Sequence, residues 1–392
     1  MKIAIKHTLL LPLLLFFFMS AQAFASKSGD VNDELEQLGT EFAAAIRHGN
    51  INAIIAMYDM ERTGELVAEQ LYDGKKQRTH FLSGFMSNSK ETFVKNLFAF
   101  QQASSSDATF LKVIETDGEK TPVVRVDLDT GGHDFVHLFA HKNEQGKWQA
   151  YDMYVATAGK RVTQKMAENL TFMLNSKSNL LKRLIGVKQL DEELIVAYRE
   201  LTHHVQQGEI QKAWDIYEQL PEKAKRSRGV LDISLGVAQL LSEELYTQQL
   251  ELLAKYHGDD PTTLFMLLDY YFTVGEYDKA ISGIRAMQDL YGEEAALNNL
   301  LANVYYMLND KEKARAFAKK SRQLEPFFIG AYWTELTLLN EANEHQQMVS
   351  LLQTMEQNWD FDFREADFAQ DTMYDIFIKS EPFVAWMQLK ND

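Results

Sequence analysis

Hydrophobic residues recur at helical spacing over the first part of the chain. Leu35, Leu38, Phe42 and Ile46 follow one another at steps of three and four, so they share one face of a helix. The sequence His48-Gly49-Asn50 ends this pattern. We expect three further helices, which are marked by apolar residues within 54–57, 66–71 and 93–100.

The pattern then changes from helical to extended. Four runs that favour strands occupy residues 108–115, 122–128, 134–141 and 148–155, and glycine-containing turns separate them. In the second run Val124 and Val126 share one face, whereas Arg125 and Asp127 share the other. Consecutive strands joined by short turns form an antiparallel meander. Helices followed by such a meander predict an α+β domain in which the helices pack on a curved antiparallel sheet.

Helical spacing returns over 160–184 and is the only pattern in the rest of the chain. A polar stretch at 175–178 marks the boundary between the two parts. We therefore predict an α+β domain over 26–175, a linker over 176–190 and an all-helical domain over 191–392.

The first residues have the layout of a secretory signal peptide. Lys2 and Lys6 precede a continuous apolar run at 9–18, and Ala23 and Ala25 offer small-residue cleavage sites. We expect residues 1–25 to be removed and the protein to be periplasmic. The alternative is an uncleaved anchor, although the apolar run is shorter than the ~20 residues of a spanning helix. No later stretch is apolar enough to span a bilayer, so we expect no integral membrane segment after cleavage.

Composition narrows the classes of function. The 392 residues carry a formal net charge of −16, which disfavours binding to the phosphate backbone of a nucleic acid. The sequence has no cysteine, which excludes disulfides, thiol catalysis and cysteine-ligated zinc. We found no motif for a nucleophile, a bound metal or a phosphate, and we expect neither a metal nor a cofactor.

The C-terminal half contains an internal repeat of 34 residues. Residues 275–280 (GEYDKA) align with 309–314 (NDKEKA), which places Ala280 and Ala314 at the same small position. This period and pattern resemble the tetratricopeptide repeat family over 261–294 and 295–328. The resemblance weakens upstream, over about 194–260, and downstream, where Met348 replaces the small residue.

The resemblance implies a helical solenoid whose concave groove binds a protein or peptide. In that family the first helix of each unit lines the groove. The matching positions here are Phe265, Asp269, Phe272, Asn299, Asn303, Tyr306, Trp333 and Thr337. Asparagine can pair with a peptide backbone, and aromatic side chains can hold an apolar anchor. The alternative is that several of these aromatic side chains pack between helices.

The N-terminal part resembles the nuclear transport factor 2-like (cystatin-like cone) superfamily. The segment 147–154 (KWQAYDMY), followed by Gly159 and a helix, carries most of this resemblance. It implies a conical cavity, and alternation on the last strand puts Trp148, Asp152 and Tyr154 on one face. Asp152 could act there as a general base, or it could simply accept hydrogen bonds.

These observations favour a non-catalytic periplasmic adaptor that binds a protein or peptide through the groove of the helical repeats. The first alternative is a carrier of a small apolar ligand or lipid in the N-terminal cavity. The second alternative is an acid–base enzyme that uses Asp152. His137 and His141 share a face of the third predicted strand, where they are candidates for ligands or acid–base groups or, alternatively, simply line the surface or the cavity.

Overall fold

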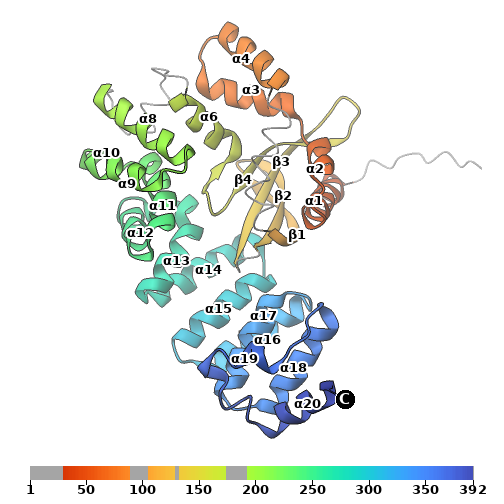
Figure 1. Ribbon diagram of the computed structural model, residues 1–392. Coiled ribbons are helices and arrows are strands. Elements are labelled where there is room, and N and C mark those ends of the chain that lie inside the picture. Colours follow the sequence, from red (N-terminus) through yellow and green to blue (C-terminus); the bar gives the residue numbers. More distant parts are fainter. Residues whose placement is uncertain (1–29, 89–104, 129–131, 174–191, 392) are drawn as a thin grey trace, which may run out of the picture.

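The structure is a computed structural model, and it describes residues 30–88, 105–128, 132–173 and 192–391. An N-terminal region with a small antiparallel sheet precedes a C-terminal region that is entirely helical where it is described (Figure 1). The predicted signal peptide, the predicted linker over 176–190 and the residues 93–100 that mark the fourth expected helix lie outside the described residues. No helix in the described ranges is long and apolar enough to cross a membrane.

Four helices open the N-terminal region: α1 (Val31–Arg47), α2 (Ile51–Met57), α3 (Met60–Leu71) and α4 (Lys75–Asn88). The side chain of Asp30 accepts a hydrogen bond from the main chain of Asn32, and thereby caps α1. Leu35, Leu38 and Phe42 are buried, as their spacing predicts. The first three predicted helices are confirmed, whereas α4 has no counterpart in the prediction.

The sheet has the predicted meander, in which each strand pairs antiparallel with the next along the chain. A two-residue strand extends the predicted set of four, and α6 (Val162–Met173) follows it. The strands are β1 (Ser105–Thr116), β2 (Glu119–Leu128), β3 (His133–Lys142), β4 (Trp148–Val155) and β5 (Lys160–Arg161).

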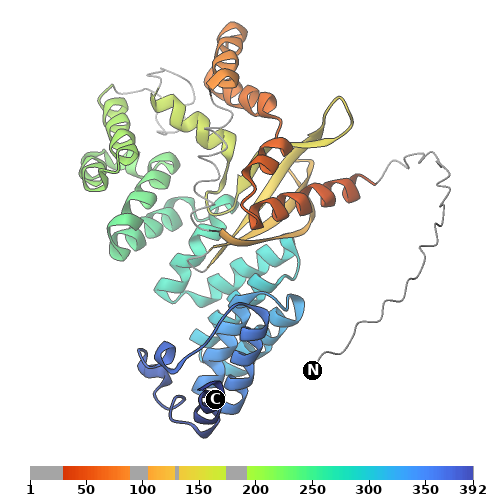
Figure 2. The ribbon, with the colours of Figure 1, turned by 45° about the vertical axis from the view of Figure 1, so that its right-hand side comes forward.

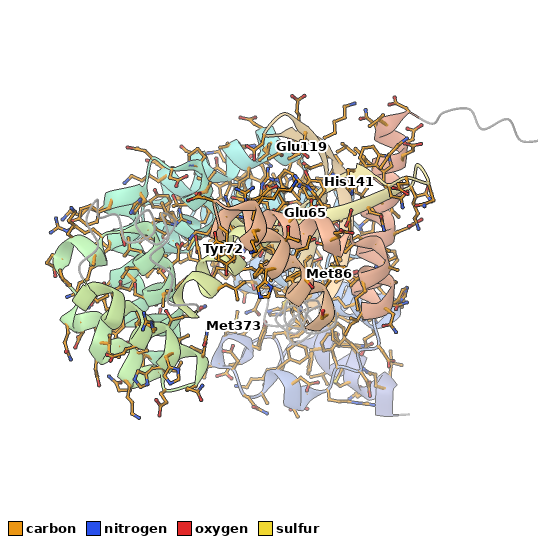
Figure 3. The ribbon with its side chains drawn as sticks, turned by 90° about the horizontal axis from the view of Figure 1, so that it is seen from above. Glu65, Tyr72, Met86, Glu119, His141 and Met373 are labelled. Carbon is orange, nitrogen blue, oxygen red and sulfur yellow. The ribbon has the colours of Figure 1, made fainter. Side chains whose placement is uncertain are left out.

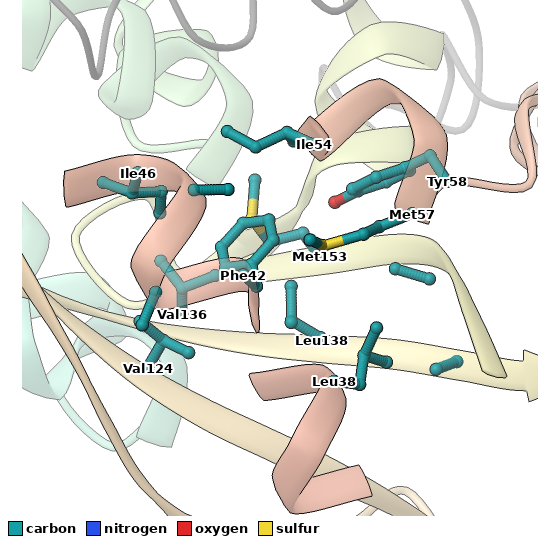
Figure 4. Packing of buried hydrophobic residues seen from close by; sticks show 14 of the residues in the cluster. Leu38, Phe42, Ile46, Ile54, Met57, Tyr58, Val124, Val136, Leu138 and Met153 are labelled. Atoms are coloured by element: carbon teal, nitrogen blue, oxygen red, sulfur yellow. The ribbon is translucent and has the colours of Figure 1, made fainter. Parts of the chain in front are cut away.

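Both faces of the sheet are covered. Residues 121–126 of β2 and 134–140 of β3 are buried without interruption. A strand with one face in water would instead show buried and exposed residues in alternation. Val124 and Val136 pack against α1 on one face, as Figure 4 shows. On the other face, Val123 and Phe135 pack against the helical region. The helical region therefore shares a core with the sheet.

The helices of the C-terminal region run as an arc, and the sheet lies against the middle of it (Figures 1 and 2). Helices α14, α16 and α18 begin at Tyr277, Lys311 and His345, 34 residues apart. The helices are α8 (Glu192–Gln206), α9 (Ile210–Gln219), α10 (Glu222–Lys225), α11 (Arg228–Leu241), α12 (Glu243–His257), η1 (Pro261–Thr263), α13 (Leu264–Val274), α14 (Tyr277–Tyr291), α15 (Ala295–Met307), α16 (Lys311–Leu324), α17 (Ile329–Glu341), α18 (His345–Asn358), α19 (Glu365–Phe368), η2 (Thr372–Tyr374) and α20 (Glu381–Asn391).

Three places along the helical region, at Thr262, Tyr291 and Glu325, contact the N-terminal region. Gly159, after β4, has a φ of +59°, and a Cβ there would lie 2.2 Å from the carbonyl oxygen of Thr262. Only glycine fits so close an approach at that φ without strain. Further along the arc, the segments around Tyr291 and Glu325 meet the sheet in the same way.

Candidate functional site

The sheet and the helical region are joined by a buried arginine. Arg125 of β2 is 0% exposed, and its guanidinium makes five hydrogen bonds to three carboxylates. It pairs at two points with Asp127 of its own strand and at two points with Glu325, which follows α16. The fifth bond runs from Nη1 to Glu294, at 2.9 Å. A guanidinium has five N–H donors, so all of them are used.

This cluster has more negative than positive charge. One guanidinium faces the carboxylates of Asp127, Glu294 and Glu325, which leaves two negative charges in excess. Glu294 also accepts hydrogen bonds from the first main-chain N–H groups of α15, which offset part of that excess. Burial raises the pKa of the Asp127 carboxyl although Arg125 lowers it, and nearby Glu325 raises it further.

Aromatic side chains continue the junction beside the arginine. The ring of Phe135 stacks on Tyr291 at 4.5 Å between centroids, and Nε2 of His137 lies 2.9 Å from the Tyr291 hydroxyl. Burial lowers the pKa of His137 to about 4, so the imidazole is neutral at neutral pH. The junction therefore combines a well-packed apolar part with a fully hydrogen-bonded ionic part.

A cleft of about 660 Å³ opens beside the arginine cluster, between β1 and the helical region. We call it the junction cleft. One wall comes from the end of α1 and from β1, and the other comes from the start of α15 and the connections that follow α16 and α18. The lining residues are Arg47, Asp107, Thr109, Phe110, Leu111, Glu293, Glu294, Ala295, Leu324, Glu325, Phe327 and Trp359.

A row of aromatic side chains leads from the junction cleft to the predicted groove. Phe327 is 64% exposed and its ring centroid lies 6.3 Å from that of Trp359. Trp359 contacts Phe361, which in turn contacts Trp333 at 6.2 Å. Trp333 is itself 40% exposed. We call Phe327, Trp359, Phe361 and Trp333 the aromatic strip.

The predicted groove residues of α15 contact α17. Asn303 Oδ1 accepts a hydrogen bond from Thr334 of α17, and Asn299 lies against Gly330 of the same helix. The hydroxyl of Tyr306 donates to Glu341, at the end of α17. These contacts favour the alternative in which such side chains pack between helices. Binding at these positions stays a prediction.

The other predicted groove residues have different surroundings. Phe265 packs edge-on against Phe135 of the sheet, and Phe272 is half-buried in the same cluster. Asp269 is exposed and lies near Tyr246, whereas Thr337 donates to the main chain of its own helix. Among the aromatic residues predicted to line the groove, Trp333 is thus the most exposed to solvent.

Of the three predicted cavity residues of β4, Trp148 does not share a face with Asp152 and Tyr154. The pairing of β3 with β4 has a bulge between Phe139 and Ala140, so the alternation on β4 shifts by one residue. Trp148 therefore packs in the core on the α1 side, whereas Tyr154 packs at the junction with the helical region. The prediction of a shared face was therefore wrong for Trp148, because period-two alternation assumes an unbroken strand, whereas Asp152 and Tyr154 lie two residues apart on the same side of the bulge.

Asp152 is buried and holds the start of α6. Its carboxylate accepts hydrogen bonds from the main chain of Met153 and from both the main chain and the hydroxyl of Thr163. Burial raises the pKa of Asp152, and these hydrogen bonds lower it. This geometry matches the interpretation of Asp152 as a hydrogen-bond acceptor.

The two histidines of β3 lie in different surroundings. His137 is buried at the junction, whereas His141 is half-exposed near α3, where its Nε2 lies 2.8 Å from Asp59 (Figure 3). No group of three or more histidine or acidic side chains in the described ranges could hold a metal ion. His137 and His141 therefore do not belong to one site.

Sequence reasoning missed Arg125, Phe327 and Trp359. The alternation on β2 placed Arg125 on the face of the sheet that points away from α1. A charged side chain on such a face is usually in contact with water. The signal for Phe327 was an apolar pair, Phe327-Phe328, in a short connection, where polar residues are usual. Trp359 opens the alternating segment 359–364 (WDFDFR), whose aromatic content was an available signal.

Comparison with known proteins adds no family to these observations. A scan against protein-family models finds no match to the chain, and a search of curated proteins finds no matching relative. The two resemblances therefore depend on the residues quoted for them, and a functional assignment depends on the geometry of the junction.

Proposed function

We propose that the chain is a non-catalytic periplasmic adaptor whose helical region binds a protein or peptide partner. The observation that carries the proposal is the aromatic strip, which links the junction cleft to the predicted groove residue Trp333. We further propose that the helical region is a tetratricopeptide-type solenoid and that the N-terminal region is nuclear transport factor 2-like. The 34-residue spacing of helix starts supports the first of these assignments.

Exposed aromatic side chains support binding for an energetic reason. Phe327 and Trp333 leave much of their apolar surface in water, which is unfavourable unless another molecule covers it. Most of the binding energy of protein interfaces is concentrated in a few such residues. The strip also combines residues from two connections with one helix, so its shape depends on the fold of the helical region.

The packing of the N-terminal core favours the adaptor over the carrier. Leu38, Phe42 and Met57 fill the space between α1, α2 and the sheet (Figure 4), where a cone-shaped ligand site was expected. Acid–base chemistry at Asp152 is disfavoured in turn, because both of its carboxylate oxygens accept hydrogen bonds from Thr163 at the start of α6.

Photo-crosslinking in the cell that makes the protein tests the proposal. The photoreactive residue benzoylphenylalanine replaces Phe327 in one variant and Leu240 in a control variant. Leu240 of α11 is 69% exposed and lies outside the aromatic strip. We expect a discrete protein adduct from position 327 and none from position 240. An absence of adducts at 327, or the same adducts from both positions, would contradict the proposal.

A further inference from the structure

The junction cleft has two chemically distinct halves. Its apolar half consists of Phe110, Leu111, Leu324, Phe327 and Trp359. Leu324 is exposed as well as Phe327, so this half is open to solvent. The volume of about 660 Å³ lies within the ~300–1,000 Å³ that is common for ligand clefts. An aromatic or leucine side chain is the natural occupant of this half.

The other half of the junction cleft is acidic. Glu294 and Glu325 line it, and with Asp127 behind them they outnumber Arg125 by three charges to one. The two further acidic lining residues already have partners, since Glu293 bonds to Lys320 and Asp107 to Arg47. The excess of negative charge therefore lies on the carboxylates around Arg125, and Arg125 has no N–H donor left to offset it. A cationic group is the complement that this half lacks.

The wall formed by β1 suits an extended chain. Among the described strands, β1 lies at the edge of the sheet, and Thr109, Phe110 and Leu111 of this strand line the cleft. The guanidinium of Arg47 already donates to the carbonyl oxygen of Ala108 at 2.6 Å, so an extended segment would pair with β1 beyond this residue, along Thr109, Phe110 and Leu111. Edge strands are common sites for the binding of extended peptides.

We propose that the junction cleft binds an extended segment of a partner protein in which a lysine or arginine lies within a few residues of an aromatic or leucine side chain. This inference rests on the proposed adaptor function and names the chemistry of its partner. The apolar side chain packs on Phe327 and Trp359, and the cation approaches Glu294 and Glu325. The net charge of −16 also draws basic segments toward the protein.

A phage-displayed library of random 12-residue peptides, selected on the immobilised full chain, tests the inference. We expect enrichment of peptides that carry lysine or arginine close to an aromatic residue or leucine. The enriched peptides are then made synthetically, and their affinities are measured by fluorescence anisotropy. Phe327→Ala should weaken them on the order of tenfold or more, as truncation of a central anchor does. Phe327→Leu, which keeps an apolar side chain, should retain most of the affinity.

Charge reversal provides the second comparison. Glu293→Lys adds a positive charge at the mouth of the cleft and should weaken the peptides severalfold. Glu251→Lys makes the same change of net charge on an exposed position of α12 and should have little effect. Circular dichroism and thermal melts of each variant show whether it has kept its fold.

Three results would overturn the inference. The first is a selection that enriches no peptides, or only peptides without basic residues. The second is equal affinity for the wild type and for Phe327→Ala. The third is self-association of the wild type in sedimentation experiments that Phe327→Ala abolishes, which would make a second copy of the chain the occupant. If photo-crosslinking at position 327 captures a protein but the selection yields no basic, aromatic peptides, the adaptor function stands. In that case only the proposed chemistry of the bound segment is wrong.

Discussion

Replacing Arg125 by methionine tests the junction most directly. Methionine keeps much of the volume and the flexibility of arginine but removes all five hydrogen bonds to Asp127, Glu294 and Glu325. The three carboxylates would stay near one another without their cation. Their side chains are at most 25% exposed, so water cannot fully replace the guanidinium.

We expect Arg125→Met to lower the free energy of unfolding by about 3–5 kcal/mol, which is the usual cost of removing one partner from a buried ion pair. The effect should depend on pH. Burial already raises the pKa of Asp127 with Arg125 present, and without the cation this pKa should rise further. A carboxyl whose pKa is higher in the folded than in the unfolded state destabilises the fold when it is ionised. The difference in the free energy of unfolding between the wild type and Arg125→Met should therefore shrink as the pH falls from 7 toward 5.

Urea unfolding of wild type and variant at pH 7 and pH 5 measures both effects, with circular dichroism and tryptophan fluorescence as probes. The triple change Asp127→Asn, Glu294→Gln, Glu325→Gln in the Arg125→Met background is the matched control, because it removes the orphaned charges. It should recover part of the lost stability at pH 7. A loss of less than about 1 kcal/mol, the same at both pH values, would show that the cluster is solvated and does not join the two regions.

Three further predictions concern separate parts of the chain. Ala280→Leu or Ala314→Leu should overpack a fully buried position and cost ~1–3 kcal/mol in urea unfolding; an unchanged midpoint would show that the repeat register is wrong. Asp152→Asn should cost about 1 kcal/mol, because asparagine keeps only part of the bonding to Thr163, and it should leave cross-linking at Phe327 intact. N-terminal sequencing of the protein released by osmotic shock should find a start near Phe24 or Ser26, whereas full-length chain in the membrane fraction would contradict export.

The local pattern was sufficient to predict most helices and strands. The spacing of Leu35, Leu38 and Phe42 indicated both α1 and its buried face, because one helix face meets one sheet. The meander was also predictable, since short turns leave consecutive strands few other ways to pair. Helix α4 was harder to find because its sequence has little apolar periodicity to mark a face.

The junction could not be predicted in the same way. Alternation on β2 correctly separates Arg125 from Val124, but it cannot tell whether the outer face meets water or other helices. That outcome depends on Glu294 and Glu325, which lie 169 and 200 residues further along the chain. The bulge on β4 is a comparable case, because the shift that separates Trp148 from Tyr154 arises from pairing with β3.

The two halves of the molecule also depend on each other for the proposed binding site. The junction cleft has one wall from β1 and the other from the helical region, so neither region forms it alone. Arg125 of β2, the strand paired with β1, holds the helical wall to the sheet, because its partners Glu294 and Glu325 line the cleft. A segment bound in the cleft would contact groups whose positions depend on this buried cluster. Binding should consequently stabilise the junction against unfolding, and loss of the junction should abolish binding even when the helical region stays folded.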